Sequence, residues 1–266
     1  PLGFTDIACV PLSALHGDNV TAASTNSPWY AGPTLLGWLE TIDVASDRVG
    51  KPLRLPVQWV NRPHADFRGF SGLIAAGSVR PGDAVRVLPS GRLTTVSRIA
   101  SFDGDQEVAV AGQSVTLCFA DEIDCSRGDV IARADEPPEV ADQFEATIVW
   151  MAEEELLPGR PYWLKLATQT VTATVHGLKH EVNVNTLERL AARTLGLNAI
   201  GVATLGTDRP LVFEPYAVDR GLGGFILVDK LSNATVGAGV LHFALRRSQN
   251  VHWQALEISR EKHAEL

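Results

Sequence analysis

The alternation of hydrophobic and polar positions changes its period near residue 50. Before that point, an apolar run at residues 7–10 predicts a buried strand, and residues 33–42 repeat at helical spacing. The apolar positions that share one helix face are Leu35, Leu36, Trp38, Leu39 and Ile42. Pro33 suits the first helical position, where its missing N–H is no loss. A strand, a loop and a helix in this order are typical of an α/β domain.

From residue 53 onward, short strands and tight turns replace this pattern. The run 80–83 predicts a type II turn, with Pro81 at the second position and Gly82 at the third, where φ must be positive. Alternating residues at 84–88 and 115–119 predict strands that bury one face. Because turn signals recur about every 8 to 12 residues, the pattern predicts a closed β-domain, which we interpret as a barrel.

A charged, stiff break at residues 136–139, with two prolines, separates this barrel from a second β-rich section. There, residues 144–150 and 164–175 alternate strictly between apolar and polar positions. Asn185, followed by Glu188 three residues later, predicts one short helix over 185–191. Further strands are predicted at 199–205, 211–218, 224–231 and 235–244.

The chain is therefore expected to be mainly β and to comprise four sections. These are an α/β section at 1–50, a barrel at 51–136, a second barrel at 137–247 and a polar, charged linker at 248–266. The only methionine is Met151, so residue 1 is not a translation start. We expect the sequence to be a piece of a longer protein whose missing part lies N-terminal.

Composition and charge restrict the kinds of partner that we expect for this protein. The 31 acidic residues exceed the 23 basic ones, for a net charge of −8, whereas a nucleic-acid-binding protein needs a basic face. No apolar run approaches the roughly 18 to 20 residues that cross a bilayer, and the start lacks the features of a signal peptide. Three scattered cysteines are typical of a reducing compartment. We expect a cytoplasmic protein with neither a nucleic-acid partner nor a membrane contact.

The loop at residues 13–20 is the first candidate for chemistry. It directly follows the predicted strand, and its small residues let backbone amides reach a planar ligand. Its sequence, Val10-Pro11-Leu12-Ser13-Ala14-Leu15-His16-Gly17-Asp18-Asn19-Val20, resembles the last guanine-nucleotide motif of translation-factor-type GTPases. The resemblance implies that Ser13, Ala14 and Leu15 bind the nucleotide: the Ala14 N–H reads the guanine oxygen and the Ser13 hydroxyl braces the loop. The alternative is a coincidental loop at a strand end.

The other nucleotide motifs do not occur in this sequence. A phosphate loop ends in Gly-Lys-Ser/Thr, whereas Gly50-Lys51 continues into Pro52. The runs 47–50 and 66–69 match the magnesium-side motif by letter, but they follow the base-binding loop, which is the wrong order. The resemblance therefore implies that GTP and Mg²⁺ are held through the missing domain. We expect no cofactor, no metal site and no catalytic residue in this piece.

The β-rich sections extend the resemblance. Residues 68–72 and 77–83 are similar to the second domain of elongation factor Tu relatives. The runs 157–162, 180–187, 198–201 and 220–239 resemble the large subunit of bacterial sulfate adenylyltransferase, with a departure at Leu222 and Gly223, where a Thr-Gly pair is expected. The implied fold is an α/β remnant of a GTPase domain, followed by two consecutive β-barrels like domains 2 and 3 of elongation factor Tu.

This resemblance implies a function. The small catalytic subunit of the enzyme joins ATP and sulfate to give adenylyl sulfate and diphosphate, and GTP hydrolysis on the large subunit drives this uphill reaction. Residues 246–254 resemble the junction to a fused adenylylsulfate kinase domain, and 255–266 can form a helix. We expect a phosphate loop within roughly twenty further residues. The alternatives are the tRNA-binding barrels of a translation factor and a plain β-barrel interaction module.

A polar loop at one barrel end is a second candidate site. Arg62, His64, Asp66 and Arg68 form either a solvated loop or a contact with another domain or a partner. The histidines and cysteines lack the spacing of a metal site, since His176 and His180 lie in a predicted strand.

Overall fold

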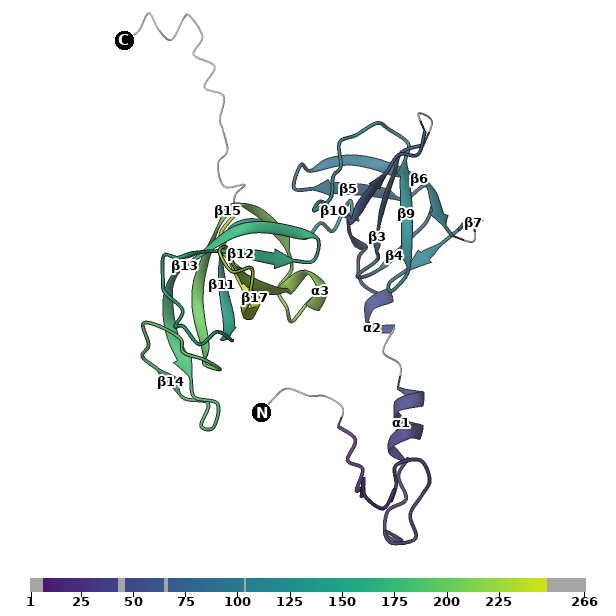
Figure 1. Cartoon of the computed structure of the whole chain (residues 1–266). Coiled ribbons are helices and arrows are strands. Elements are labelled where there is room, and N and C mark those ends of the chain that lie inside the picture. Colours follow the sequence, from purple (N-terminus) through teal and green to yellow (C-terminus); the bar gives the residue numbers. More distant parts are fainter. Residues whose placement is uncertain (1–6, 43–45, 65–66, 103, 248–266) are drawn as a thin grey trace, which may run out of the picture. The chain divides into compact units, whose positions relative to one another are not determined.

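The computed structural model describes residues 7–42, 46–64, 67–102 and 104–247 (Figure 1). The chain divides into two compact units, Pro1–Asp47 and Arg48–Leu266. The first consists of loops and one helix, α1 (Leu35–Thr41), while α2 (Ser46–Val49) spans the boundary in sequence. The second contains the whole set of described strands, in two large antiparallel sheets and one small one.

In the first unit, the predicted helix is confirmed and the predicted strand is wrong. Thr34, rather than Pro33, is adjacent to the first helical residue, and its side chain accepts the Gly37 N–H at 3.1 Å. Residues 7–10 adopt no strand. A strand needs a neighbour for its backbone hydrogen bonds, and the described part of this unit contains only isolated bridges around Asp18.

The first sheet closes into a barrel through one bent stretch of chain. Its strands follow the order β1-β10-β5-β6-β9-β3-β2, and β7 pairs with β6. Only Val57 and Gln58 separate β1 from β2: the Val57 N–H donates to the Asp129 carbonyl and the Gln58 N–H to the Ser71 carbonyl, both at 2.8 Å. The bounds are β1 (Arg54–Pro56), β2 (Trp59–Asn61), β3 (Gly69–Leu73), β4 (Ser78–Val79), β5 (Ala84–Leu88), β6 (Arg92–Ser101), β7 (Gly104–Asp105), β8 (Ala109–Val110), β9 (Ser114–Phe119) and β10 (Val130–Arg133).

The turn predicted at residues 80–83 is confirmed. Gly82 has φ of +94°, and the Asp83 N–H donates to the Arg80 carbonyl at 3.1 Å. The turn leads into β5, whose Val85 and Val87 are buried in an aliphatic core with Leu55 and Ile131.

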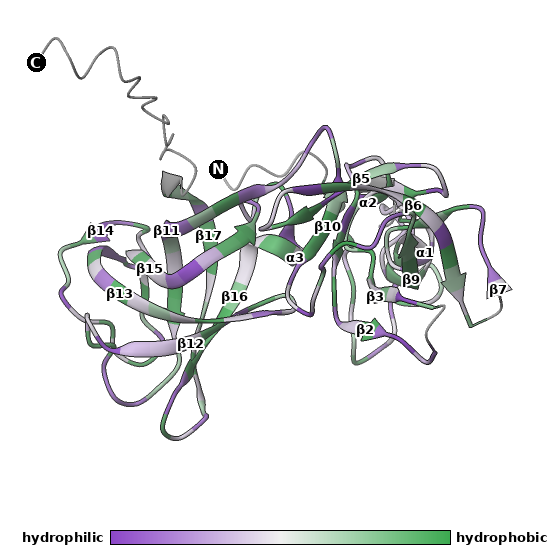
Figure 2. Cartoon of the chain, turned by 90° about the horizontal axis from the view of Figure 1, so that it is seen from above, coloured by the Kyte–Doolittle hydropathy of each residue, from purple (hydrophilic) through white to green (hydrophobic). Residues whose placement is uncertain are grey.

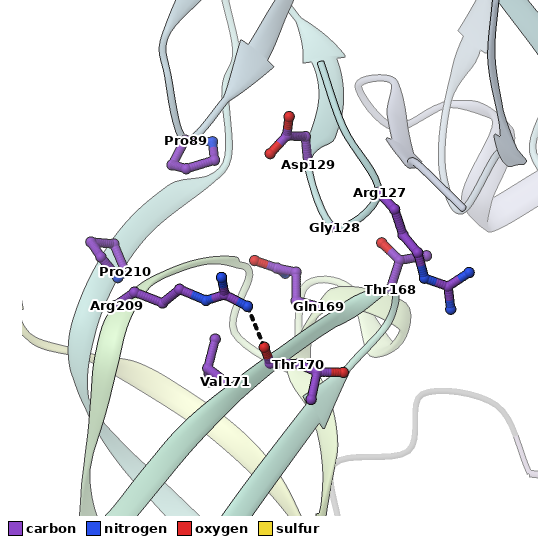
Figure 3. A pocket seen from close by; sticks show the side chains of 10 residues that line it. All are labelled: Pro89, Arg127, Gly128, Asp129, Thr168, Gln169, Thr170, Val171, Arg209 and Pro210. Atoms are coloured by element: carbon purple, nitrogen blue, oxygen red, sulfur yellow. Dashed lines mark hydrogen bonds between the residues drawn. The ribbon is translucent and has the colours of Figure 1, made fainter. Parts of the chain in front are cut away.

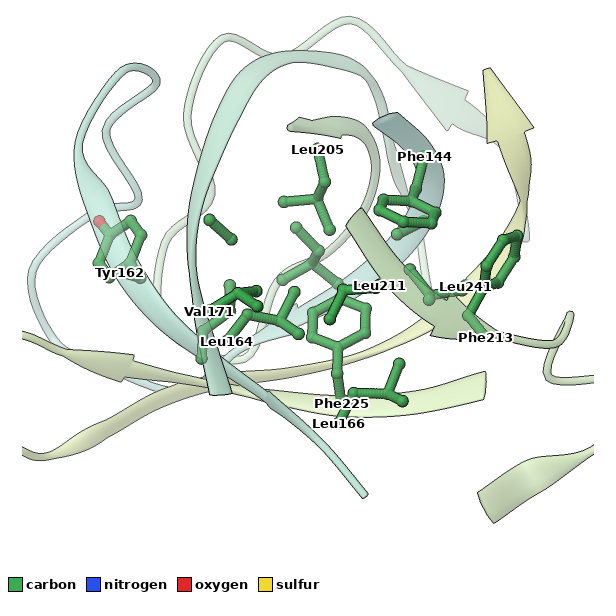
Figure 4. Packing of buried hydrophobic residues seen from close by; sticks show 14 of the residues in the cluster. Phe144, Tyr162, Leu164, Leu166, Val171, Leu205, Leu211, Phe213, Phe225 and Leu241 are labelled. Atoms are coloured by element: carbon green, nitrogen blue, oxygen red, sulfur yellow. The ribbon is translucent and has the colours of Figure 1, made fainter. Parts of the chain in front are cut away.

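The second sheet also closes on itself. Its order is β12-β16-β17-β11-β15-β13, and β12 pairs again with β13, which completes a ring of strands; β14 extends β13. The bounds are β11 (Glu139–Trp150), β12 (Pro161–Leu166), β13 (Gln169–Val182), β14 (Arg189–Leu190), β15 (Ile200–Phe213), α3 (Arg220–Gly223), β16 (Gly224–Asp229) and β17 (Thr235–Arg247). Side chains of these strands point into a common interior, where the Phe144 and Phe213 ring centroids lie 4.9 Å apart (Figure 4).

The alternation read from the sequence is confirmed in both barrels. Phe144, Ala146 and Ile148 are fully buried along β11, and Val171 is buried on β13 where Thr170 is exposed. Green and purple residues mix along the strands in Figure 2. This period of two follows from the opposite directions of successive side chains in a strand.

Two other predictions in the second barrel need correction. The predicted helix at 185–191 is a hairpin: the Asn183 side-chain oxygen accepts the N–H groups of Asn185 and Thr186, and Leu187 has φ of +61°. A local side-chain bond of this kind competes with helix formation. The strands predicted at 199–205 and 211–218 are one strand, β15, which ends at Phe213. The predicted linker and helix at 248–266 lie outside the described residues.

Candidate functional site

Backbone hydrogen bonds close the loop at residues 13–20, whose sequence resembles the guanine-nucleotide motif. The Gly17 N–H donates to the Ser13 carbonyl at 2.8 Å, and the Ser13 N–H donates to the Asp18 carbonyl at 3.2 Å. Gly17 has φ of +77°, a conformation that glycine adopts at no steric cost. The His16 N–H donates to the Ser13 Oγ at 3.3 Å, so the Ser13 hydroxyl braces the turn.

The tip of this loop is open. Ala14 and Leu15 are exposed, and Leu15 keeps 87% of its accessible surface. Within the described residues, neither the Ala14 N–H nor the Leu15 N–H has a hydrogen-bond partner. Two adjacent backbone donors are thus available to an acceptor outside the chain.

Asn19 holds the loop in this shape. It is only 2% exposed, and its Nδ2 donates to the Pro11 carbonyl at 2.8 Å and to the Ser27 Oγ at 2.7 Å. Its Oδ1 accepts the Ser24 N–H at 2.8 Å. The Asn19 carbonyl accepts the Leu35 N–H, so the same residue ties the loop to α1. The sequence motif contains Asn19, but its structural role depends on contacts up to 16 positions away.

The neighbouring carboxylate of Asp18 is engaged within the loop. It accepts the Ser24 hydroxyl at 2.5 Å and the Asn26 amide at 3.0 Å. The hydrogen bond from Ser24 is the main cause that lowers the pKa of Asp18. Asp18 therefore acts as a structural acceptor within the loop, and the Ala14 and Leu15 N–H groups remain its open donors.

The second candidate site, at residues 62–68, is only partly a solvated loop. Arg62 and His64 are exposed, whereas Arg68 is half-buried, with its guanidinium carbon 5.6 Å from the Phe70 ring centroid. Asp66 lies outside the described residues. Phe67, the aromatic residue of the same loop, is the important neighbour: its ring contacts His64, with centroids 6.0 Å apart.

A hollow of about 280 Å³ lies at the seam between the two barrels, inside the second unit. Two of its polar side chains bond within the chain: Arg209 donates to the Thr170 carbonyl, and Gln169 exchanges two hydrogen bonds with the Val212 backbone at 2.8 and 2.9 Å. The buried Thr168 Oγ1 has no hydrogen-bond partner among the described residues. In Figure 3 the Arg127 side chain points away from Arg209, so the two cations do not converge on one ligand. The hollow is therefore a packing gap between the two barrels.

A buried ion pair also joins the two barrels. Arg54 of β1 contacts Glu214, just after β15, through Nη2 at 2.5 Å and Nε at 2.6 Å, and the side chains are 6% and 12% exposed. Lys51 donates to the Val218 carbonyl at 2.5 Å. Leu88 and Val130 of the first barrel belong to the apolar cluster of the second. The ion pair and the apolar contacts therefore lie at the same boundary between the two barrels, called here the seam.

The described residues contain no metal centre, and two of the three cysteines are buried. No group of three or more His, Cys, Asp or Glu among them could hold a metal ion. Burial raises the pKa of Cys118, and it raises the pKa of Cys125 to about 12. In the same part of the chain, no helix is long and apolar enough to cross a membrane.

Comparison with known proteins first defines the class. Crystal structures of Sup35 complexed with GMPPNP and with GDP match this fold with TM-scores of 0.72 at 23% and 24% identity. They cover 89% and 91% of this chain, and it covers 58% and 60% of theirs. The family described as GTP-eEF1A C-terminal domain-like matches residues 143–242. The chain thus has the mainly β fold of elongation-factor-type GTPases, as the sequence predicted.

Sequence relatives then define the particular group. The chain is 53% identical over 267 residues to a bifunctional enzyme CysN/CysC of Xylella fastidiosa, covering 100% of this chain and 42% of that protein. It is 51% identical to a bifunctional enzyme NodQ of Azospirillum brasilense, covering 100% of the chain and 43% of that protein.

The name of a third relative refers to one activity only. Sulfate adenylyltransferase subunit 1 of Aeromonas salmonicida is 47% identical, with 98% of this chain and 59% of that protein covered. The chain is therefore a homologue, along its whole length, of sulfate adenylyltransferase subunit 1 and of the bifunctional CysN/CysC and NodQ enzymes. It spans roughly two fifths to three fifths of their length, and the predicted resemblance is confirmed.

Proposed function

We propose that the chain is part of the GTP-hydrolysing subunit of a sulfate adenylyltransferase, in sulfate assimilation. In the whole protein, GTP hydrolysis is coupled to the formation of adenylyl sulfate from ATP and sulfate. The observation that carries the proposal is the similarity to subunit 1 and to the bifunctional enzymes over the full chain. This piece contributes no catalytic residue; it contributes one contact to the nucleotide base and the two barrels.

The base contact is assigned to Ser13, Ala14 and Leu15. The Ala14 N–H donates to the guanine oxygen, the Leu15 N–H lies beside it, and the Ser13 hydroxyl holds the turn. The open donors at the loop tip and the bracing bond to Ser13 support this assignment. The phosphates and Mg²⁺ are bound by the rest of the GTPase domain.

The exposed face of α1 supports the proposed domain division. None of its residues is buried, although Leu36 and Leu39 lie on one apolar face. An amphipathic helix gains most of its stability from packing that face, so residues 1–50 form the end of a GTPase domain whose remainder covers it. The barrels then occupy 51–136 and 137–247, and 248–266 forms a linker.

The two barrels act as one lever. A nucleotide drives a partner only by binding two conformations with different affinity. The buried Arg54–Glu214 pair and the shared apolar cluster make the barrels move together when the nucleotide loops reorder.

Two partners complete the function, and both act in the cytoplasm. The small catalytic subunit binds ATP and sulfate. In the bifunctional form, an adenylylsulfate kinase domain follows the second barrel, as the names of the bifunctional relatives suggest. Arg62, His64, Asp66 and Arg68 contribute a contact with another domain or partner, and nucleic acid is not a partner.

The base contact is tested in the full-length protein with a nucleotide analogue. Ala14→Pro removes the donor, and His16→Ala, which changes only an exposed side chain, is the matched control. We expect the wild type and His16→Ala to bind GTP at least tenfold more tightly than 2-aminopurine riboside triphosphate, which lacks the guanine oxygen. Ala14→Pro should lose this discrimination. Equal discrimination in all three proteins would remove Ala14 from the site.

The function itself is tested by co-expressing the full-length protein with its small subunit. GTP should raise the amount of adenylyl sulfate formed from ATP and sulfate beyond the amount reached with GMPPNP. An equal yield with both nucleotides would refute the coupling.

A further inference from the structure

Asn19 is the only buried residue among the described residues of the first unit. A side-chain amide has two N–H donors and a carbonyl oxygen, and burying it costs free energy unless these groups are bonded. The Asn19 Nδ2 donates to the Pro11 carbonyl at 2.8 Å and to the Ser27 Oγ at 2.7 Å. Its Oδ1 accepts the Ser24 N–H at 2.8 Å. An amide bonded on both atoms at a buried position favours one arrangement of the segments around it.

These bonds reach both sides of the loop that is proposed to contact the guanine base. Pro11 precedes the loop and Ser27 follows it, each eight positions away from Asn19. A bond across a loop removes conformations that the free loop would otherwise sample. The bonds of Asn19 therefore restrict the directions in which the Ala14 N–H points before a nucleotide binds. Such preorganisation lowers the entropic cost of binding.

The backbone at Asn19 is attached to the first turn of α1. The Asn19 carbonyl accepts the Leu35 N–H at 2.9 Å, and the next carbonyl, that of Val20, accepts an N–H of the same turn at 2.9 Å. The first N–H groups of a helix have no partner inside the helix, so the loop supplies the acceptors that this end of α1 needs. The side chain of Asn19 thus bonds to both sides of the loop, while its backbone fixes the loop to a helix.

A second asparagine of the same unit allows a direct comparison. Asn26 is exposed, and its Nδ2 donates to the Asp18 carboxylate at 3.0 Å. This carboxylate also accepts the Ser24 hydroxyl, so it keeps a partner when the Asn26 amide is removed. The two asparagines have the same side chain, but only the side chain of Asn19 is buried and bonds to both sides of the loop.

We propose that Asn19 is a positioning residue for guanine recognition. Through its bonds to Pro11 and Ser27 it aims the Ala14 N–H at the guanine oxygen, and it thereby sets the preference of the site for GTP over purine nucleotides that lack this oxygen. The inference rests on the proposed function, in which Ala14 contacts the base. Because the base lies apart from the phosphate bond that is cleaved, its contact is equally strong in the ground state and in the transition state. Loss of such a contact raises KM and leaves kcat unchanged.

The test measures GTP hydrolysis and nucleotide affinity in the full-length protein. Asn19→Ala removes all of the side-chain bonds, whereas Asn19→Asp keeps an acceptor for the Ser24 N–H and loses both donors. Asn26→Ala is the matched control. We expect each Asn19 variant to raise KM for GTP at least tenfold, with kcat within twofold of the wild type, and to lose the preference for GTP over 2-aminopurine riboside triphosphate. The control should stay within twofold of the wild type in each quantity.

A milder variant keeps the test decisive if the Asn19 variants do not fold. Ser27→Ala removes one acceptor of the Asn19 amide and leaves the bond to Pro11 in place. It should raise KM for GTP about two- to fivefold, with kcat and the melting temperature unchanged.

Two results overturn the inference. The first is an unchanged KM and an unchanged preference for GTP in the folded variants of Asn19 and Ser27. The second is a lower kcat or a lower melting temperature with an unchanged KM, which would mean that Asn19 only stabilises the fold. Ala14→Pro, measured beside these variants, separates the two proposals: if it alone loses the preference for GTP, the proposed base contact stands without Asn19. A wild-type protein that shows no such preference overturns the base contact and this inference together.

Discussion

The first unit and the two barrels use the same kind of amphipathic sequence with opposite results. In the barrels, alternating residues close two sheets around apolar cores, and side chains such as Leu55 are fully buried. In the first unit, α1 has an equally clear apolar face, but none of its residues is fully buried: Leu35 and Trp38 are half-buried and Leu36 and Leu39 are exposed. The buried anchor of the loop is instead the polar Asn19. A periodic pattern thus indicates that an apolar face must pack against another element. Among the described residues, the exposed part of the apolar face of α1 still lacks such a partner.

The largest expected effect concerns the ion pair that joins the barrels. Arg54→Ala leaves Glu214 buried without its partner, so the free energy of unfolding should fall by about 3–5 kcal/mol. Arg133→Ala, which breaks an exposed pair with Asp135, should cost at most about 1 kcal/mol. Urea denaturation measures both. Equal losses would mean that the seam does not hold the barrels together.

This seam also marks a limit of prediction from sequence. The barrels followed from local signals, because turn glycines such as Gly82 and strict alternation at 144–150 act within a few residues. The Arg54–Glu214 pair joins positions 160 residues apart, and no local pattern indicates it. The loop proposed to contact the base was likewise singled out by its motif, whereas the open donors at Ala14 and the anchoring by Asn19 required coordinates. The predicted strand at 7–10 and helix at 185–191 were wrong, because pairing and an Asn183 turn decided those segments.

A second prediction sharpens the comparison between the two units. Leu55→Ala deletes a fully buried side chain and should cost about 2–5 kcal/mol. Leu39→Ala, at a position that is 54% exposed on α1, should change the stability of this chain by less than about 0.5 kcal/mol. Chemical denaturation of both variants provides the measurement. A large loss for Leu39→Ala would show that α1 already packs against the chain.

A turn of the first barrel should give a smaller effect. Gly82→Val forces a β-branched residue into positive φ, at a cost of about 1–3 kcal/mol, although a Cβ there meets no atom within 4 Å. Ser90→Ala should stay within about 0.5 kcal/mol. If the denaturation midpoints of the two variants coincide, backbone strain is not the reason why this turn favours glycine at position 82.

The smallest expected effect is a pH dependence at one turn of the second barrel. Hydrogen bonds from the backbone and side chain of Ser232, and one from Arg160, hold the pKa of Asp229 at about 2. Because an unfolded Asp titrates near about 3.9, the stabilisation is complete above that pH and is lost as pH falls toward 2. Thermal melts between pH 5 and pH 2 should show a shallower loss for Asp229→Asn. Parallel curves for the two proteins would rule out this contribution.

We propose that the Arg54–Glu214 pair and the shared apolar cluster make the two barrels move together when the nucleotide loops reorder. The most direct measurement is the yield of adenylyl sulfate per GTP hydrolysed, in the full-length protein with its small subunit, for the wild type and Arg54→Ala. At a temperature where both proteins are folded, the account predicts continued GTP hydrolysis in the variant with a yield near that obtained without GTP. A wild-type yield from a variant that lacks the Arg54–Glu214 pair would contradict it.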